Sequence, residues 1–294
     1  MPALADAARA VGTRTWLDLP EGFVPAAEFT GFQMDEPRAT VAVAELPSSF
    51  VDAYNTYTDS GLARKRVTVT ARESFELDGL RAVLIEGVQP IGRRDVHKLI
   101  MLTGDLDDTL IITATYFADD ARVHRAPLMN ALRNTHWQPS LPLDLYDGLA
   151  FRLKDVPGLR IATRANNNVV FTDTGQLPDQ FYTGHMLVAG WSDVDKALAD
   201  DALAVAQQQF RAMSMVNTGI IDDVVYKRVN DRQAIETVGH GVHKHLGYDV
   251  SVYQVLVVYP SRYFLIQGLA DRSDEKEAFD RFDSVVGTLT ADGP

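Results

Sequence analysis

Hydrophobic and polar residues alternate along the chain in two blocks, and this pattern predicts β-strands. In the first block the expected strands are residues 15–19, 40–45, 67–70, 74–77, 81–88, 98–103 and 109–117. In the second block they are residues 149–153, 186–189, 220–228, 234–238, 250–259 and 263–269. Short turns that contain Gly or Asp separate many of these segments, and short connections favour antiparallel neighbours. Each block therefore predicts an antiparallel sheet.

A helix is expected inside each block, after the strand at 40–45 and after the strand at 186–189. Ser48 or Ser49 can cap the first helix, because a serine oxygen accepts the free N–H groups of a first turn, and Gly61 is expected to end it. Ser192 and Asp195 resemble a capping box that opens a helix of about 20 residues in the second block. The second helix is thus expected to be the longer one.

Each block also ends on an amphipathic helix. In the first block Pro127 is expected in the first helical turn, where a proline is tolerated, and Leu128 and Leu132 continue on one face. In the second block the apolar residues follow i, i+3, i+4, i+7 spacing: Ala278, Phe279, Phe282, Val285, Val286 and Leu289. This helix is expected to bury its apolar stripe on a sheet.

The two blocks repeat the same order of elements, which indicates a tandem duplication. Segments of the first block recur about 150 residues later in the second: 77–88, 98–102 and 110–117 correspond to 230–239, 250–258 and 263–269. The proline-containing segment 139–144 is the natural linker, so the expected domains are residues 1–140 and 141–294. The second block carries about 15 additional residues around 166–168 and 173–178, whose polar composition predicts solvated loops rather than a binding loop.

Composition narrows the possible functions. The 294 residues carry a net charge of −12, which argues against binding to nucleic acid, because phosphate contacts require clustered Lys and Arg. The basic run 64–66 is read as cations at a helix end rather than as a partner-binding patch. The chain has no cysteine, so disulfides and thiolate chemistry are excluded. Aspartates interrupt its most apolar stretch, residues 98–117, so no membrane span is expected.

The first ten residues are rich in alanine and contain small-x-small patterns of the kind that precede signal-peptidase cleavage, but they lack an apolar region. Two interpretations stay open. Either a leader has been removed and the protein is exported, or the segment is the start of a cytoplasmic protein.

The order strand, turn, strand, helix, antiparallel strands and closing helix resembles the PsbP-like superfamily, which includes the DcrB-like envelope proteins and Mog-type import factors. The resemblance rests on residues 17–23 with Gly31-Phe32, and on segments 79–88, 98–102, 110–116 and 128–137, and it covers most of the first block. It implies two tandem α+β repeats, each an antiparallel β-sheet flanked by helices in an α/β/α sandwich. It also implies proteins that act by binding other proteins, and it supplies no catalytic residues.

The segment His240-Gly-Val-His243-Lys-His245 is the candidate metal site, since it holds three of the seven histidines. In an extended segment His243 and His245 project to the same face, where two imidazoles could bind one Zn²⁺ or Cu²⁺, with His240 as a third ligand. The alternative is a hairpin loop with exposed histidines, because glycines at 239, 241 and 247 surround the segment.

Other motifs do not indicate an enzyme. The acidic run 105–108 lacks the spacing of a Ca²⁺ loop and predicts a hairpin turn. The sequence holds no nucleophile elbow, no His-Glu-x-x-His and no Walker loop, and acidic doublets such as Asp222-Asp223 are expected to be solvated.

We therefore expect a non-catalytic binding or scaffolding protein of the bacterial cell envelope, with an unknown protein partner and no cofactor. One alternative is a cytoplasmic chaperone for secreted effectors, a role that tandem members of the superfamily have. The other is a metal-dependent enzyme that uses the three histidines. The sequence leaves the oligomeric state open.

Overall fold

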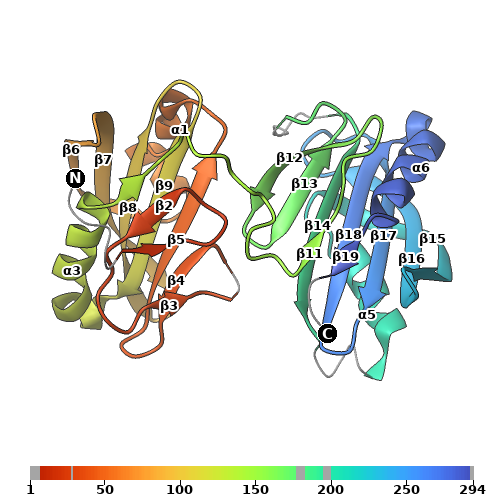
Figure 1. The fold of residues 1–294 in the computed structure, drawn as a ribbon, viewed down its shortest axis with the longest axis horizontal. Helices are drawn as coiled ribbons and strands as arrows, with labels where there is room; N and C mark the ends of the chain where they lie inside the picture. Colours follow the sequence, from red (N-terminus) through yellow and green to blue (C-terminus); the bar gives the residue numbers. More distant parts are fainter. Residues whose placement is uncertain (1–6, 28, 177–182, 195–199, 292–294) are drawn as a thin grey trace. The chain divides into compact units, whose positions relative to one another are not determined.

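A computed structural model describes residues 7–27, 29–176, 183–194 and 200–291. The chain divides into two compact units, Met1–Asp147 and Gly148–Pro294. Both consist of antiparallel sheets with a few helices, so the α+β class is confirmed (Figure 1). No helix among the described residues is long and apolar enough to cross a membrane.

The first unit is built on a seven-stranded sheet with the order β3-β4-β5-β9-β8-β7-β6, in which every neighbouring pair is antiparallel. Its strands are β3 (Val24–Pro25), β4 (Gly31–Met34), β5 (Ala39–Leu46), β6 (Thr68–Leu77), β7 (Leu80–Ile91), β8 (Arg94–Gly104) and β9 (Thr109–Phe117). The helices are α1 (Phe50–Thr56), α2 (Asp59–Arg64) and α3 (Ala121–Arg133), with a 3₁₀ turn, η1 (Ala118–Asp120), before α3. A small separate sheet contains β1 (Ala8–Arg9), β2 (Thr15–Leu17) and β10 (His136–Trp137).

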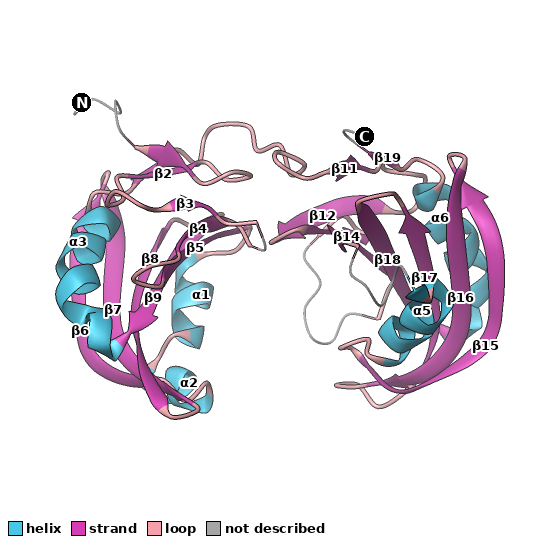
Figure 2. Ribbon diagram, turned by 90° about the horizontal axis from the view of Figure 1, so that it is seen from below, coloured by secondary structure: helices cyan, strands magenta, loops and turns pink. Residues whose placement is uncertain are grey.

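Strand β8 shows how this sheet forms two cores. Leu99 and Met101 lie in the cluster on the α3 side, whereas Ile100 and Leu102 lie in the cluster on the α1 and α2 side. This alternation is the period of two that a strand imposes on its side chains. The unit is therefore an α/β/α sandwich, with the small sheet also packed on the α3 side (Figure 2).

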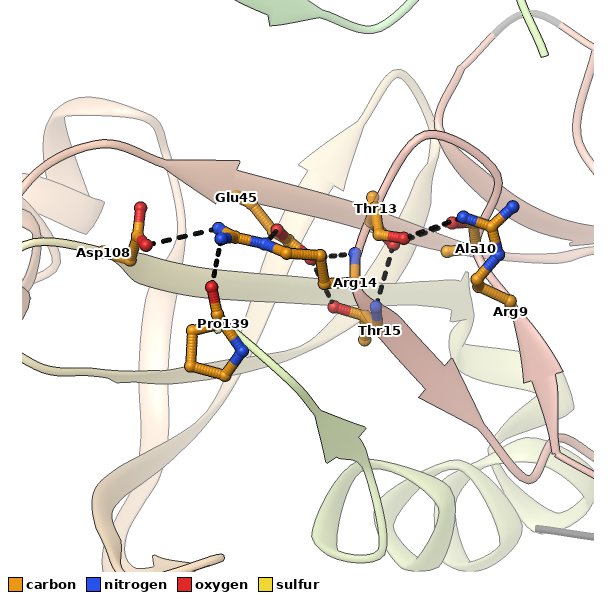
Figure 3. A network of polar contacts seen from close by, with 8 residues as sticks. All are labelled: Arg9, Ala10, Thr13, Arg14, Thr15, Glu45, Asp108 and Pro139. Atoms are coloured by element: carbon orange, nitrogen blue, oxygen red, sulfur yellow. Dashed lines mark hydrogen bonds and ion pairs between the residues drawn. The ribbon is translucent and has the colours of Figure 1, made fainter. Parts of the chain in front are cut away.

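An almost completely buried polar network fixes the start of the first unit to its central sheet (Figure 3). Arg14, just before β2, forms an ion pair with Glu45 of β5, and its backbone N–H donates to the same carboxylate at 2.6 Å. The guanidinium also donates to the carbonyl of Pro139 and lies 3.3 Å from the Asp108 carboxylate. The expected strand at 15–19 is thus short and belongs to the small sheet rather than to the central one.

The second unit repeats this strand order. Its seven-stranded antiparallel sheet runs β12-β13-β14-β18-β17-β16-β15. The strands are β12 (Arg160–Ala165), β13 (Asn168–Thr172), β14 (Met186–Asp193), β15 (Val216–Val229), β16 (Arg232–His243), β17 (Asp249–Val258) and β18 (Arg262–Asp271). The unit also contains helix α5 (Ala202–Arg211), the 3₁₀ turn η2 (Arg272–Asp274), helix α6 (Glu275–Val286) and a two-stranded sheet of β11 (Phe151–Arg152) and β19 (Thr290–Ala291). The repeated order agrees with a tandem duplication, whose common origin stays a prediction.

Glycines in the second sheet let aromatic rings from the helices pack against its backbone. A Cβ atom at Gly268 in β18 would lie 2.6 Å from the ring of Phe282 in α6. A Cβ atom at Gly239 in β16 would lie 2.8 Å from the ring of Phe210 in α5. These approaches place α5 and α6 on the sheet, and the expected closing helix with its buried stripe is confirmed.

In both units a strand near the start pairs with a strand near the end. Strand β2 pairs antiparallel with β10, and β11 pairs antiparallel with β19. The domain boundary expected after residue 140 stays a prediction. Beyond that residue the chain still contacts the first unit. The Asp147 carboxylate accepts a hydrogen bond from the Gly12 N–H at 3.1 Å and lies 2.6 Å from the guanidinium of Arg9.

Gly61 does not end the first inner helix, as had been expected. Ser49 caps α1 as predicted, but α1 stops at Thr56, and Thr58 caps a second helix that contains Gly61. The position is occupied by glycine because a Cβ there would lie 2.3 Å from the Thr56 carbonyl oxygen. The basic run does follow a helix end, since Arg64 is the last residue of α2.

Pro127 lies in the interior of α3 and not in its first turn, so that expectation was also wrong. Proline removes the N–H that would bond the carbonyl four residues earlier, which belongs to Val123. Both Pro127 and Val123 are exposed, so water can hydrate that carbonyl. Packing of the buried face, which includes His124 and Leu128, stabilises the helical conformation on both sides of the proline.

The second inner helix begins later than predicted. Ser192 is part of β14, Asp195 lies outside the described residues, and α5 starts at Ala202. Asp201 provides the cap by accepting a hydrogen bond from the Ala204 N–H at 2.9 Å. Residues 190–193 pair with β18, so Ser192 lies in a strand and does not cap a helix.

Residues 166–168 are not an additional loop of the second unit. Asn166 and Asn167 form the turn between β12 and β13, which take the places of β3 and β4 in the repeated sheet order. Asn166 has a φ of 55°, a left-handed conformation that asparagine adopts more readily than most residues. Pro178, in the other part of the expected insertion, lies outside the described residues.

Candidate functional site

Of the three histidines of the candidate metal site, His243 and His245 lie together, with ring centroids 6.2 Å apart, and His240 does not join them. His240 and His243 both belong to β16, and residues three apart in a strand point to opposite faces. The strand ends at His243, so His245 lies in the following turn rather than on the same face of an extended segment. No group of three or more His, Asp or Glu side chains that could hold a metal ion occurs among the described residues. Metal binding here stays a prediction, which metal analysis of untagged protein tests.

His243 is buried, which corrects the expectation of an exposed loop histidine at that position, whereas His245 is exposed in the turn, as expected. Its ring stacks on Tyr248 with centroids 5.7 Å apart, and its Nδ1 accepts hydrogen bonds from the N–H groups of His245 at 3.3 Å and Leu246 at 3.2 Å. Burial lowers the pKa of His243, and the neighbouring His245 lowers it further. The neutral imidazole therefore acts as a cap for the turn that follows β16.

His240 lies in a polar chain on the face covered by α6. Its Nδ1 is 2.8 Å from the carboxylate of Asp222, one member of an acidic doublet that is exposed to solvent, as expected. Ser251 is the direct cross-strand partner of His240, but its buried hydroxyl donates to Glu275 at 2.6 Å. Arg272 lies 3.2 Å from Glu275 and 4.0 Å from Asp222. Serine, histidine and aspartate thus meet here without an accessible nucleophile, and they join α6 to the strands.

A second polar cluster lies under α6. The ammonium group of Lys227 contacts both Glu236 and Asp283, and the Tyr253 hydroxyl donates to Asp283 at 3.1 Å. Burial raises the pKa of Tyr253, and the charge of Asp283 raises it further. Burial lowers the pKa of Lys227, but its hydrogen bonds to the two carboxylates outweigh that effect and raise it. The cluster is internally satisfied and stabilises the packing of α6.

The acidic turn at 105–108 is a hairpin turn, as predicted. The Asp105 carboxylate accepts hydrogen bonds from the N–H groups of Asp107 at 2.8 Å and Asp108 at 2.9 Å. These backbone hydrogen bonds lower the pKa of Asp105. Its oxygen is thus occupied by the turn itself.

The first unit has a hollow of about 440 Å³ between the turn at Pro20, the β4–β5 connection and the outer side of α3. Val24 of β3 and Val123 of α3 line it and are 51% and 56% exposed. Its other lining residues are Pro20, Glu21, Gly22, Met34, Asp35, Glu36, Pro37 and His124. We name this site the valine hollow. Its described lining combines exposed apolar side chains with three carboxylates and holds no lysine or arginine.

His124 anchors α3 at the valine hollow. The side chain is buried, and its Nε2 lies 3.0 Å from the Pro37 carbonyl oxygen. Its ring also contacts Tyr116 and Phe23, with centroid distances of 5.8 Å and 6.5 Å. On the opposite side, a Cβ at Gly22 would lie 3.0 Å from Met34 Cε, so the turn fits closely over the methionine. The walls of the hollow are therefore fixed by packed contacts.

The second unit has a hollow of about 600 Å³ in the corresponding place, between the turn at Val156-Pro157 and α6. Here the lining is mainly ionic: Ser273, Asp274, Lys276, Glu277, Asp280, Arg281 and Ser284. The Arg281 guanidinium lies against Gly158, contacts Glu277, and is 3.0 Å from His185 Nδ1. This hollow places two cations beside three carboxylates, in contrast to the valine hollow.

The sequence did not indicate the valine hollow. Val123 lies off the buried face of α3, which is formed by His124, Leu128, Ala131 and Leu132. Val24 precedes Pro25 in a strand of two residues, too short for a recognisable alternation. In the sequence Val24 is flanked by Phe23 and Pro25, and Val123 by Arg122 and His124, so no local signal indicated the hollow.

No protein-family model matches the chain, and no curated protein matches its sequence. Among solved structures, it is similar to the complex of Tle4 with Tli4, with 12% identity over 98% of both chains and a TM-score of 0.37. It is also similar to the apo immunity protein TplEi of the T6SS of Pseudomonas aeruginosa, with 11% identity over 98% of both chains and a TM-score of 0.37. A third is the cyanobacterial PsbP of Synechocystis sp. PCC 6803, with 13% identity, a TM-score of 0.33, and coverage of 47% of this chain and 95% of that one. At these identities and TM-scores the similarities assign no function, and membership of the PsbP-like superfamily stays a prediction from the sequence.

Proposed function

We propose that this chain is a non-catalytic binding protein that holds a partner protein at the valine hollow. The observation that carries the proposal is the exposure of Val24 and Val123 in one hollow with fixed walls. Apolar surface gains free energy when a partner covers it, at about 25 cal/mol per Å². Exposed apolar groups surrounded by polar residues are typical of protein interaction sites.

The charge of the hollow indicates the chemistry of its occupant. Glu21, Asp35 and Glu36 line it, and the whole chain has a net charge of −12. A partner segment with an apolar side chain next to lysine or arginine would match both features, because complementary charge speeds and orients association. We therefore propose an extended, basic and apolar segment of a protein as the ligand.

The polar clusters support a binding role rather than catalysis. Ser251 is buried and donates to Glu275, and His124 in the valine hollow is engaged with the Pro37 carbonyl. A nucleophile must reach its substrate, and a general base must be free to take a proton. Neither condition is met by these two residues.

The test is capture of partners by immobilised full-length protein from an envelope extract. Three forms are compared: the wild type, the double variant Val24→Glu with Val123→Glu, and Val51→Glu as a matched control. Val51 is an exposed valine in α1, outside the hollow. We expect a protein that the wild type and the control retain, that the double variant loses, and that salt releases. Identical capture by all three forms would contradict the proposal.

We also propose that the protein acts in the bacterial cell envelope. The support is the sequence resemblance to envelope proteins and the small-x-small pattern in residues 3–7. Fractionation of cells that express the natural gene tests it, with periplasmic recovery expected. Recovery only with the cytoplasm would favour the alternative of a chaperone for secreted effectors.

A further inference from the structure

The edge strand β15 offers a surface that the valine hollow does not explain. It is the last strand in the order of the second sheet, and among the described residues it pairs with β16 alone. Its other side therefore carries backbone N–H and C=O groups without a strand partner in the described part of the chain (Figure 2). At fourteen residues it is longer than most strands. Edge strands of this kind are templates for pairing with another chain.

Exposed apolar side chains lie on this strand. Tyr226 is 69% exposed, Val225 is 44% exposed, and Ile220 is also about half exposed. Bulges, which commonly protect an edge, occur between Asn217 and Asp223. The remaining residues, 223–229, pair one to one with residues 232–238 without any irregularity. The exposed Val225 and Tyr226 therefore lie in the regular part of the edge.

The charges beside these residues are arranged for self-recognition. Asp222 and Asp223 precede the apolar residues Val224, Val225 and Tyr226, and Lys227 and Arg228 follow them. In an antiparallel pair of identical strands, the acidic end of each copy lies opposite the basic end of the other. A parallel pair would place like charges together. Arg228 is the more exposed of the two cations, because Lys227 contacts Glu236 and Asp283.

The register follows from symmetry. Every second residue of an edge strand directs its backbone N–H and C=O groups away from the sheet. Two identical antiparallel strands can form hydrogen bonds only if these residues of one copy lie opposite the same kind of residue in the other. The twofold axis therefore lies at a residue, which faces its own counterpart in the second copy. An axis at Val225 pairs Asp223 with Lys227, Asp222 with Arg228, and Val224 with Tyr226 of the other copy. An axis at Tyr226 would instead pair Asp223 with Val229 and Val225 with Lys227. The axis at Val225 alone matches opposite charges with each other and apolar residues with each other.

We propose that this protein forms a twofold-symmetric dimer in which β15 pairs with β15 of a second copy, centred on Val225. The pairing joins the β12–β15 sheets of the two copies into one continuous sheet and covers the β15 edge of both. The proposal is independent of the valine hollow, which belongs to the first unit.

A disulfide test exploits the absence of cysteine from the chain. In the proposed register the two Val225 side chains face each other, with Cβ atoms about 4.5–5.5 Å apart, close to the range that a disulfide spans. Full-length Val225→Cys is therefore expected to form a covalent dimer on mild oxidation. Thr70→Cys, at an exposed position of the edge strand β6 of the first unit, is the control and should stay monomeric. Equal crosslinking of both variants, or of neither, would overturn the proposal.

Charge substitutions at the same position provide a reversible test. Val225→Glu and Val225→Lys each place like charges on the axis, so each variant alone should sediment as a monomer, and a mixture of the two should recover the dimer. Thermal unfolding followed by circular dichroism shows whether both variants are folded. A wild-type protein that sediments as a monomer at every concentration would overturn the dimer and leave the valine hollow unaffected. Partner capture that the hollow variants retain, with the dimer intact, would overturn the proposal for the valine hollow and leave the dimer unaffected.

Discussion

Arg14 and Glu45 form an ion pair in which the two side chains are only 11% and 4% exposed, with Nε 2.7 Å from Oε2. The Thr15 hydroxyl donates to the same carboxylate at 2.9 Å. Two opposite charges are thus enclosed where the small sheet of the first unit meets its central sheet. Removal of one partner from such a pair leaves the other charge buried without compensation.

We expect Arg14→Ala to lower the free energy of unfolding of the full-length protein by about 3 kcal/mol. Urea titration followed by circular dichroism measures the change. The double variant Arg14→Met with Glu45→Leu should lose less, because it leaves no unpaired charge. A double variant that is as unstable as Arg14→Ala would show that packing, and not the charge, sets the cost.

The end of the first unit can be located by truncation. Because Asp147 binds Arg9 and the Gly12 N–H, we expect a fragment of residues 1–147 to melt at a higher temperature than a fragment of residues 1–140. The loss should be about 1 kcal/mol, the usual size for a hydrogen bond to a charged group at a partly exposed site. Asp147→Asn in the longer fragment should reproduce most of the difference. Equal melting temperatures would support the boundary after residue 140.

The burial of His243 predicts a pH dependence of stability. Its pKa in the folded protein is lower than in the unfolded chain, where it is about 6.5, so the unfolded state binds the extra proton first. Stability is therefore complete above that pH and is lost as the pH falls from 6.5 toward the folded value. We expect His243→Asn to remove part of the decrease in urea midpoint between pH 7.5 and pH 5.5.

His245→Asn is the control for that measurement. It removes only the smaller cause of the lowered pKa, because burial of His243 is the larger one. Most of the pH dependence should thus remain in this variant. If His243→Asn and the wild type lose stability in parallel, other groups are responsible.

Two buried tyrosines provide a matched comparison. The Tyr253 hydroxyl donates to Asp283, whereas the Tyr116 hydroxyl has no hydrogen-bond partner among the described residues. We expect Tyr253→Phe to cost about 2 kcal/mol, and Tyr116→Phe to be neutral or slightly stabilising. Chemical denaturation of both variants checks this difference. A comparable loss from Tyr116→Phe would indicate that an ordered water satisfies its hydroxyl.

The sequence predicted the central strands well because these are buried on both faces or alternate regularly. The expected strand at 109–117 coincides with β9, whose residues contribute to both cores. It missed β3 and β4, because strands of two and four residues contain too few positions for an alternation. The hairpin of β12 and β13 was likewise mistaken for an insertion, since its counterpart in the first half had not been recognised.

The candidate sites were harder to predict because they depend on which face of a strand a residue occupies. The histidine segment suggested a cluster, but β16 continues through residue 240 and separates His240 from His243. The contact of His240 with Asp222 joins two residues eighteen positions apart in the sequence, on neighbouring strands. Neither their pairing nor the exposure of Val24 and Val123 is encoded in a local pattern.

The pairing of β2 with β10, and of β11 with β19, means that each unit begins and ends at the same place. A fold whose two ends are neighbours can be appended to another copy, or reopened at a different loop with its old ends joined, without rerouting any strand through the sheet. Such a fold is inherently modular. The same property that lets two of these units follow each other in one chain would let a third be added, or one be removed, by changes confined to the connecting segment.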